Sequence, residues 1–133
     1  MDVQQMIGSH PDVAGRVSEP LVVCIEECFA AAQACVSCAD ACLAEPERDA
    51  LVQCIRLTLD CADICSAAGA VASRRAGSNH AILRNIISSA SEACRFCGAE
   101  CEHHAERHQH CRLCAEACYR CDAACRTALQ AVH

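Results

Sequence analysis

The chain has 133 residues, a net charge of −6 with histidine neutral, and 16 cysteines but no tryptophan. This length fits one domain with a hydrophobic core, and an acidic chain without a basic cluster is not a typical nucleic-acid-binding protein. Cysteine makes up 16 of the 133 residues, which exceeds the roughly 8–10% that marks a cysteine-based framework.

The N-terminal stretch MDVQQMIGSHPDVAG has neither the basic start nor the apolar segment of a secretory signal peptide. No run of about 18 apolar residues occurs, so we expect no segment that spans a membrane. These features predict a cytoplasmic protein. In the cytosol, abundant cysteines indicate metal binding or redox chemistry rather than structural disulfides.

The sequence predicts a short N-terminal helix over 2–8, followed by four long amphipathic helices. Pro20 suits the first turn of the first long helix, and Pro46 ends it because the residue before a proline avoids the helical region. Gly77 is a natural stop for the second long helix, whereas the turn near 105–108 is marked only by a change of phase in the cysteine pattern. The predicted long helices are 20–43, 47–75, 79–104 and 108–131.

Four such helices with short connections predict an all-α fold, an antiparallel up-down-up-down four-helix bundle that forms a single domain over 1–133. In this topology the loops at 44–46 and 103–110 lie at one end of the bundle, and the second of them is rich in histidine. The opposite end is expected to be closed by aliphatic residues, namely Leu21, Val71, Leu83, Ile87, Ala128 and Val132.

The cysteines follow the helical repeat and predict the lining of the core. In the stretch CRLCAEACYRCDAAC, which runs from Cys111 to Cys125, the gaps between cysteines are 3, 4, 3 and 4, the spacing of one stripe on a helix. The other long helices repeat the pattern, with Ala31 and Thr58 at the core positions that it skips. The residues expected to face the interior are Cys24, Cys28, Cys35, Cys38, Cys42, Cys54, Cys61, Cys65, Cys94, Cys97, Cys101, Cys111, Cys114, Cys118, Cys121 and Cys125.

Metal binding explains these thiols better than core filling or disulfides. Free cysteine is usually retained for its reactivity, since alanine or leucine would fill a core equally well. Residues three or four apart on a helix have Cβ atoms about 5–6 Å apart, whereas a disulfide needs about 3.5–4.5 Å. A linear thiolate–metal–thiolate unit spans about 4.6 Å, which suits this spacing.

Charge favours Cu(I) as the metal. Many thiolates buried together must be neutralised, because each buried ion costs several kcal/mol. Cu(I) is soft, selects thiolate and leaves the core neutral at about one ion per thiolate, whereas Zn²⁺ in Cys₄ sites leaves each site negatively charged. We therefore predict that all sixteen cysteines bind multiple Cu(I) ions.

Three histidines extend this predicted site at the loop end of the bundle. His104 and His108 continue the stripe beyond Cys101, and His110 adjoins Cys111. Imidazole also binds copper, so these three side chains are predicted to be ligands or to pass ions inward.

Two alternatives differ from this interpretation. One is a zinc-thiolate store, distinguished by fewer ions per thiol. The other, ranked lower, is a thiol redox protein that uses a CxxC pair such as Cys35 and Cys38, although such pairs usually lie at a helix N-terminus in an α/β fold. No Ser/His/Asp arrangement or phosphate-binding loop occurs, so we predict that the protein is not an enzyme.

The chain resembles the bacterial copper storage proteins, in particular their cytosolic branch. The resemblance covers the whole chain and is closest in CIEEC, VSCADAC, QCIRLTLDCADIC, CRFCGAEC and CRLCAEACYRCDAAC. It implies a four-helix bundle that stores Cu(I) for copper homeostasis or detoxification, commonly as a homotetramer, with the histidine-bearing end as the entrance. Relatives can carry more cysteines, and Ala31 occupies a position where a thiol is possible, which implies a lower capacity here.

Overall fold

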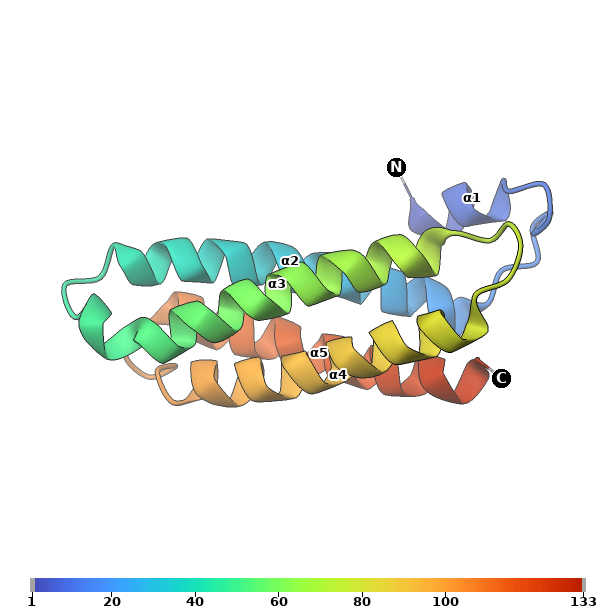
Figure 1. Ribbon diagram of the computed structural model, residues 1–133. Coiled ribbons are helices and arrows are strands. Elements are labelled where there is room, and N and C mark those ends of the chain that lie inside the picture. Colours follow the sequence, from blue (N-terminus) through green and yellow to red (C-terminus); the bar gives the residue numbers. More distant parts are fainter. Residues whose placement is uncertain (1, 133) are drawn as a thin grey trace.

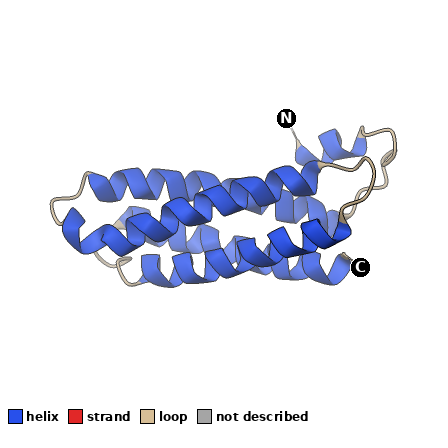
Figure 2. Ribbon diagram, in the orientation of Figure 1, coloured by secondary structure: helices blue, strands red, loops and turns tan. Residues whose placement is uncertain are grey.

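The computed structural model describes residues 2–132, which form one short and four long α-helices (Figure 1). The long helices run alternately up and down. α2 and α4 each pack against both α3 and α5, and no strand occurs within residues 2–132 (Figure 2). The predicted all-α four-helix bundle with a short N-terminal helix is thus confirmed. The helices are α1 (Val3–Gly8), α2 (Glu19–Leu43), the 3₁₀ helix η1 (Arg48–Leu51), α3 (Val52–Ser73), α4 (His80–Glu102) and α5 (Gln109–Ala131).

The second long helix differs from the predicted range 47–75. After Pro46 the chain first forms the tighter η1 turn, whose last residue, Leu51, is only 1% exposed and anchors the turn in the core. At its other end α3 stops at Ser73 because Arg74 adopts an extended backbone. Gly77 has a φ of +69° and shapes the following loop instead of capping the helix.

The connection between α4 and α5 is longer than the predicted turn at 105–108. It begins at His103, and the chain tightens there through hydrogen bonds between residues three apart, such as His104 N–H to the Cys101 carbonyl at 3.0 Å. His108 has an extended backbone and directly precedes α5. This connection and the one between α2 and α3 lie at the same end of the bundle, which we call the mouth (Figure 1).

Aliphatic residues close the end opposite the mouth. Five of the six residues predicted there are buried, and Val71 is partly buried against the same cluster. The Arg84 guanidinium donates hydrogen bonds to the Leu129 and Val132 carbonyls at the C-terminus of α5, where a cation also interacts favourably with the helix dipole. The bundle therefore has one sealed end and one polar end.

Among residues 2–132, one helix, α2, is long and apolar enough to span a membrane by length and composition, with a mean hydropathy of 1.6 over an 18-residue window. Half of that window is buried inside the bundle. Much of the buried face consists of cysteine, so the core explains this hydropathy. A single helix of this kind is weak evidence for a membrane span.

Two aromatic rings lie directly on glycines of the neighbouring helix. A Cβ added at Gly98 in α4 would lie 2.8 Å from Tyr119 Cε1 of α5, and a Cβ at Gly69 in α3 would lie 2.8 Å from Phe29 Cζ of α2. The Tyr119 hydroxyl also donates a hydrogen bond to Glu102. Glycine at these positions allows α2 to approach α3, and α5 to approach α4, beneath a large side chain.

We expect Gly98→Ala to destabilise the protein by about 1 kcal/mol, because the clash with Tyr119 costs about 1–3 kcal/mol and outweighs the gain of about 1 kcal/mol in helix propensity. In a Tyr119→Ala background the same change should instead stabilise, since the ring is gone. Urea unfolding of the four proteins measures both values. A Gly98→Ala variant that is more stable than the parent chain would contradict the close contact.

Candidate metal centre

The structure buries all sixteen cysteine side chains, and none is more than 1% exposed. All of them lie within the described residues and none forms a disulfide. The gaps of three, four and seven residues keep each thiol on the inner face of its helix. The core is therefore a column of sulfur that runs along the bundle axis.

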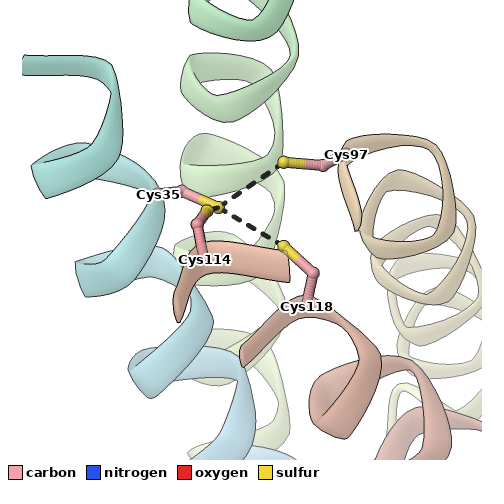
Figure 3. Close-up of side chains that lie close together, drawn as sticks. All are labelled: Cys35, Cys97, Cys114 and Cys118. Carbon is pink, nitrogen blue, oxygen red and sulfur yellow. Dashed lines mark hydrogen bonds between the residues drawn. The ribbon is translucent and has the colours of Figure 1, made fainter. Parts of the chain in front are cut away.

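At the middle of the column, thiols from three helices converge (Figure 3). Cys35 Sγ of α2 lies 3.9 Å from Cys97 Sγ of α4, 3.7 Å from Cys118 Sγ and 3.7 Å from Cys114 Sγ of α5. All four sulfurs lie within 4.8 Å of one another. This group has enough donors for a three- or four-coordinate soft ion without movement of the backbone.

Further groups continue the column in both directions. Toward the mouth lie Cys38, Cys101 and Cys114, and then Cys38, Cys42, Cys54 and Cys111; toward the sealed end lie Cys61, Cys65 and Cys94, and then Cys24, Cys28 and Cys125.

Neighbouring groups on the mouth side share thiols. Cys38 belongs to both mouth-side groups, and Cys114 also belongs to the middle group. Cys121 joins the sealed-end group through Cys28 Sγ at 3.7 Å and Cys125 Sγ at 3.9 Å. An ion bound in one mouth-side group is therefore already in contact with a ligand of the next.

The thiol–thiol distances match metal coordination. The sulfurs of each group lie within 4.8 Å of one another, with pairs such as Cys65 and Cys94 at 3.5 Å and Cys38 and Cys111 at 4.0 Å, far longer than the S–S bond of about 2.05 Å. Two sulfurs on one metal with bonds of about 2.3 Å lie about 4.0 Å apart in trigonal and about 3.8 Å apart in tetrahedral geometry. Small side-chain rotations therefore suffice to bind an ion.

Hydrogen bonds and burial raise the pKa of some core thiols, and hydrogen bonds lower that of others. A hydrogen bond with Cys125, together with burial, raises the pKa of Cys24 to about 12. At the mouth, a hydrogen bond with Cys38 lowers the pKa of Cys111, but a hydrogen bond with Cys54 and burial together outweigh it and raise this pKa to about 12. Since the thiolate is the metal ligand, binding a cation at these positions must release protons.

The three predicted histidines have different surroundings in the structure. His110 Nδ1 lies 3.5 Å from Cys38 Sγ and 3.6 Å from Cys111 Sγ, so this ring reaches the column. His108 is buried, with a side chain only 7% exposed, and it faces carboxylates. His104 lies in the connection after α4 and pairs with Glu100 of α4 at 3.0 Å.

Two glutamates at the mouth were not predicted as part of the site. Glu45 Oε2 lies 2.8 Å from both His108 Nδ1 and His110 Nε2, and Glu47 Oε1 lies 3.0 Å from His108 Nε2. The hydrogen bond with His110 has the largest effect on the Glu45 carboxyl and lowers its pKa, against an opposing effect of burial. In the sequence Glu45 and Glu47 flank Pro46. The one feature that could have pointed to them is their negative charge, at the end of the bundle where the histidine-rich loop was also expected.

The fold and the column of thiols define a class of protein, a helical bundle whose interior is a multi-site binder of soft metal ions. The family model described as copper storage protein matches residues 17–130. The chain therefore belongs to the copper storage protein family.

Solved structures and a curated relative agree with this assignment. The cytosolic copper storage protein Ccsp from Streptomyces lividans, in a form loaded with 10 copper equivalents, is 45% identical with a TM-score of 0.91, and the match covers 98% of this chain and 99% of that chain. The Cu(I)-bound copper storage protein BsCsp3 from Bacillus subtilis is 38% identical with a TM-score of 0.67, covering 77% and 92%. An uncharacterized cysteine-rich protein, YhjQ of Bacillus subtilis strain 168, is 38% identical over 104 residues, which are 78% of this chain and 91% of that protein.

Proposed function

We propose that this protein stores copper by binding many Cu(I) ions to the thiolates of its core. The observation that carries the proposal is the column of buried thiols, in which mouth-side groups share cysteines and the sulfurs of each group lie within 4.8 Å of one another. The two solved relatives described above hold copper, which supports Cu(I) over the zinc alternative. In this function all sixteen cysteines are ligands, His110 is a ligand at the mouth, and His104 and His108 stand at the entrance.

A binding protein fits the site better than an enzyme. A thiol redox centre needs an accessible thiolate, whereas Cys35 and Cys38 are at most 1% exposed and lie in the interior of α2. The family comprises copper storage proteins rather than enzymes. The resemblance to the cytosolic branch supports a cytoplasmic location, and the tetramer that it implies is expected here on the same ground.

An anaerobic titration of the reduced apo protein with Cu(I), against a competing chelator, tests this function. We expect tight binding of about one ion per thiolate and release of about one proton per ion, because a ligand thiol must lose its proton. Affinity should accordingly fall as the pH is lowered. Saturation near four ions, with Zn²⁺ able to compete, would instead establish discrete Cys₄ zinc sites.

A further inference from the structure

Two histidines and two glutamates form a cap over the mouth of the thiol column. The His108 and His110 rings are stacked, with centroids 5.3 Å apart and planes inclined by 19°. One oxygen of Glu45 lies 2.8 Å from a nitrogen of each ring. Glu47 contacts only His108. Glu45 thus joins the loop after α2 to the start of α5.

The contacts of His110 determine which of its nitrogens can bind a metal. A neutral imidazole has one N–H donor and one acceptor nitrogen. A carboxylate only accepts, so the nitrogen facing Glu45, Nε2, carries the hydrogen. The lone pair is then on Nδ1, which lies 3.5 Å from Cys38 Sγ and 3.6 Å from Cys111 Sγ.

We propose that Glu45 is a positioning residue that holds His110 with Nδ1 toward Cys38 and Cys111, so that the three side chains form the first copper-binding site at the mouth. This inference rests on the proposed storage function. His108 has a different role, because both of its nitrogens face carboxylates and neither is available to a metal. Its ring supports Glu45 and stacks on His110.

The same site explains how an ion moves inward. Cys38 and Cys111 also belong to the group with Cys42 and Cys54. An ion bound to His110 can therefore exchange its nitrogen ligand for a third sulfur while both original sulfurs stay bound. The Cu–N bond breaks as the new Cu–S bond forms, and the freed Nδ1 can accept the proton that the incoming thiol gives up. No oxidation state changes.

An alternative is that Glu45 only attracts cations to the mouth by its charge. Glu100 provides a matched control. It lies near the C-terminus of α4, at the mouth, and its partner His104 contacts no thiol among the described residues. Glu45→Ala and Glu100→Ala each remove one carboxylate at the mouth; Glu45→Ala removes the contacts with His108 and His110, and Glu100→Ala the contact with His104. Glu45→Gln removes the charge but retains an oxygen that can accept the His110 hydrogen bond.

The experiment measures anaerobic stopped-flow uptake of Cu(I) from a weak chelator by the reduced apo protein and the three variants. Loss of a group that orients a metal ligand typically costs about 10–100-fold, so we expect Glu45→Ala to slow the first phase at least about tenfold. Glu100→Ala should change it less than about twofold, and Glu45→Gln should restore most of the rate. An equal slowing of all three variants would show charge attraction only and overturn the proposal, as would an unchanged rate in Glu45→Ala.

A second measurement on the apo protein is independent of copper. Nitrogen-15 NMR of the imidazole at a pH where it is neutral should show His110 as the Nε2–H tautomer in the parent protein and Glu100→Ala, and a mixture of tautomers in Glu45→Ala. An Nδ1–H tautomer in the parent would overturn the proposal. The final number of ions per chain distinguishes the test of copper storage from the test of His110 positioning. A parent protein that binds no copper contradicts storage. Altered uptake rates at full capacity concern only the positioning of His110.

Discussion

Loading the reduced protein with Cu(I) is expected to raise the midpoint of thermal unfolding by more than about 20 °C. A ligand that binds only the folded state stabilises it by about 2.7 kcal/mol per site at a concentration of 100 times Kd. Several filled sites together exceed about 10 kcal/mol, and each kcal/mol shifts the midpoint by about 2–6 °C for a chain of this size. Each ion also links helices that are otherwise held by packing and by a few hydrogen bonds, such as the one from Tyr119 to Glu102.

The apo protein is nevertheless expected to keep its helices. The largest fully buried side chains include Ile25, Leu51 and Ile87, which pack without any metal, and the thiols at the core positions are themselves apolar when protonated. This behaviour differs from a zinc finger, which unfolds when its metal is removed.

Circular dichroism of the apo and loaded forms, followed by differential scanning calorimetry, measures both effects. The helical signal should be the same in the two forms and only the midpoint should differ. Mg²⁺ serves as the control, because it prefers oxygen ligands and should cause no shift. Loss of the helical signal on removal of copper would show that the fold depends on the metal.

The second large expected effect is a loss of rapid copper uptake when the middle of the thiol column is blocked. Replacing Cys35, Cys97, Cys114 and Cys118 with serine should limit rapid uptake to the mouth side, because ions must pass the middle group to reach the sealed end. The buried hydroxyls are tolerable, since Thr58 already occupies such a position and donates to the Cys54 carbonyl at 2.8 Å. Five of the 16 thiols lie on the mouth side, so about one third of the parent's capacity should fill rapidly.

The matched control replaces the same number of thiols at the sealed end, namely Cys24, Cys28, Cys121 and Cys125. This variant also keeps 12 of the 16 thiols, and it should fill rapidly to about three quarters of the parent's capacity. Stopped-flow uptake with a final count of bound copper compares the two. Equal rapid capacity in both variants would show that ions enter through the sides of the bundle rather than along its axis.

The sequence alone was sufficient to predict the bundle and the lining of its core. Gaps of three and four residues match the helical period, so the inward position of every cysteine is a local property of each helix. Pro46 marked the end of α2 for an equally local reason, the steric restriction on the residue before a proline. The choice of Cu(I) followed from softness and charge, which are properties of the thiolate itself.

The tertiary structure determines which side chains from different helices and loops come into contact. The histidine stripe predicted His104 and His108 beside the column, yet the turn after α4 pairs one with Glu100 and the other with Glu45, and only His110 reaches two thiols. Glu45 and His110 are 65 residues apart, and their contact exists because the two mouth connections meet at one end.

The sharing of thiols between neighbouring groups likewise depends on how closely the helices approach. Part of that approach is set by glycines under aromatic rings, such as Gly98 beneath Tyr119. A periodic pattern determines which face of a helix a residue occupies. The partners that it meets there depend on loop geometry and helix spacing, which arise only when the whole chain packs.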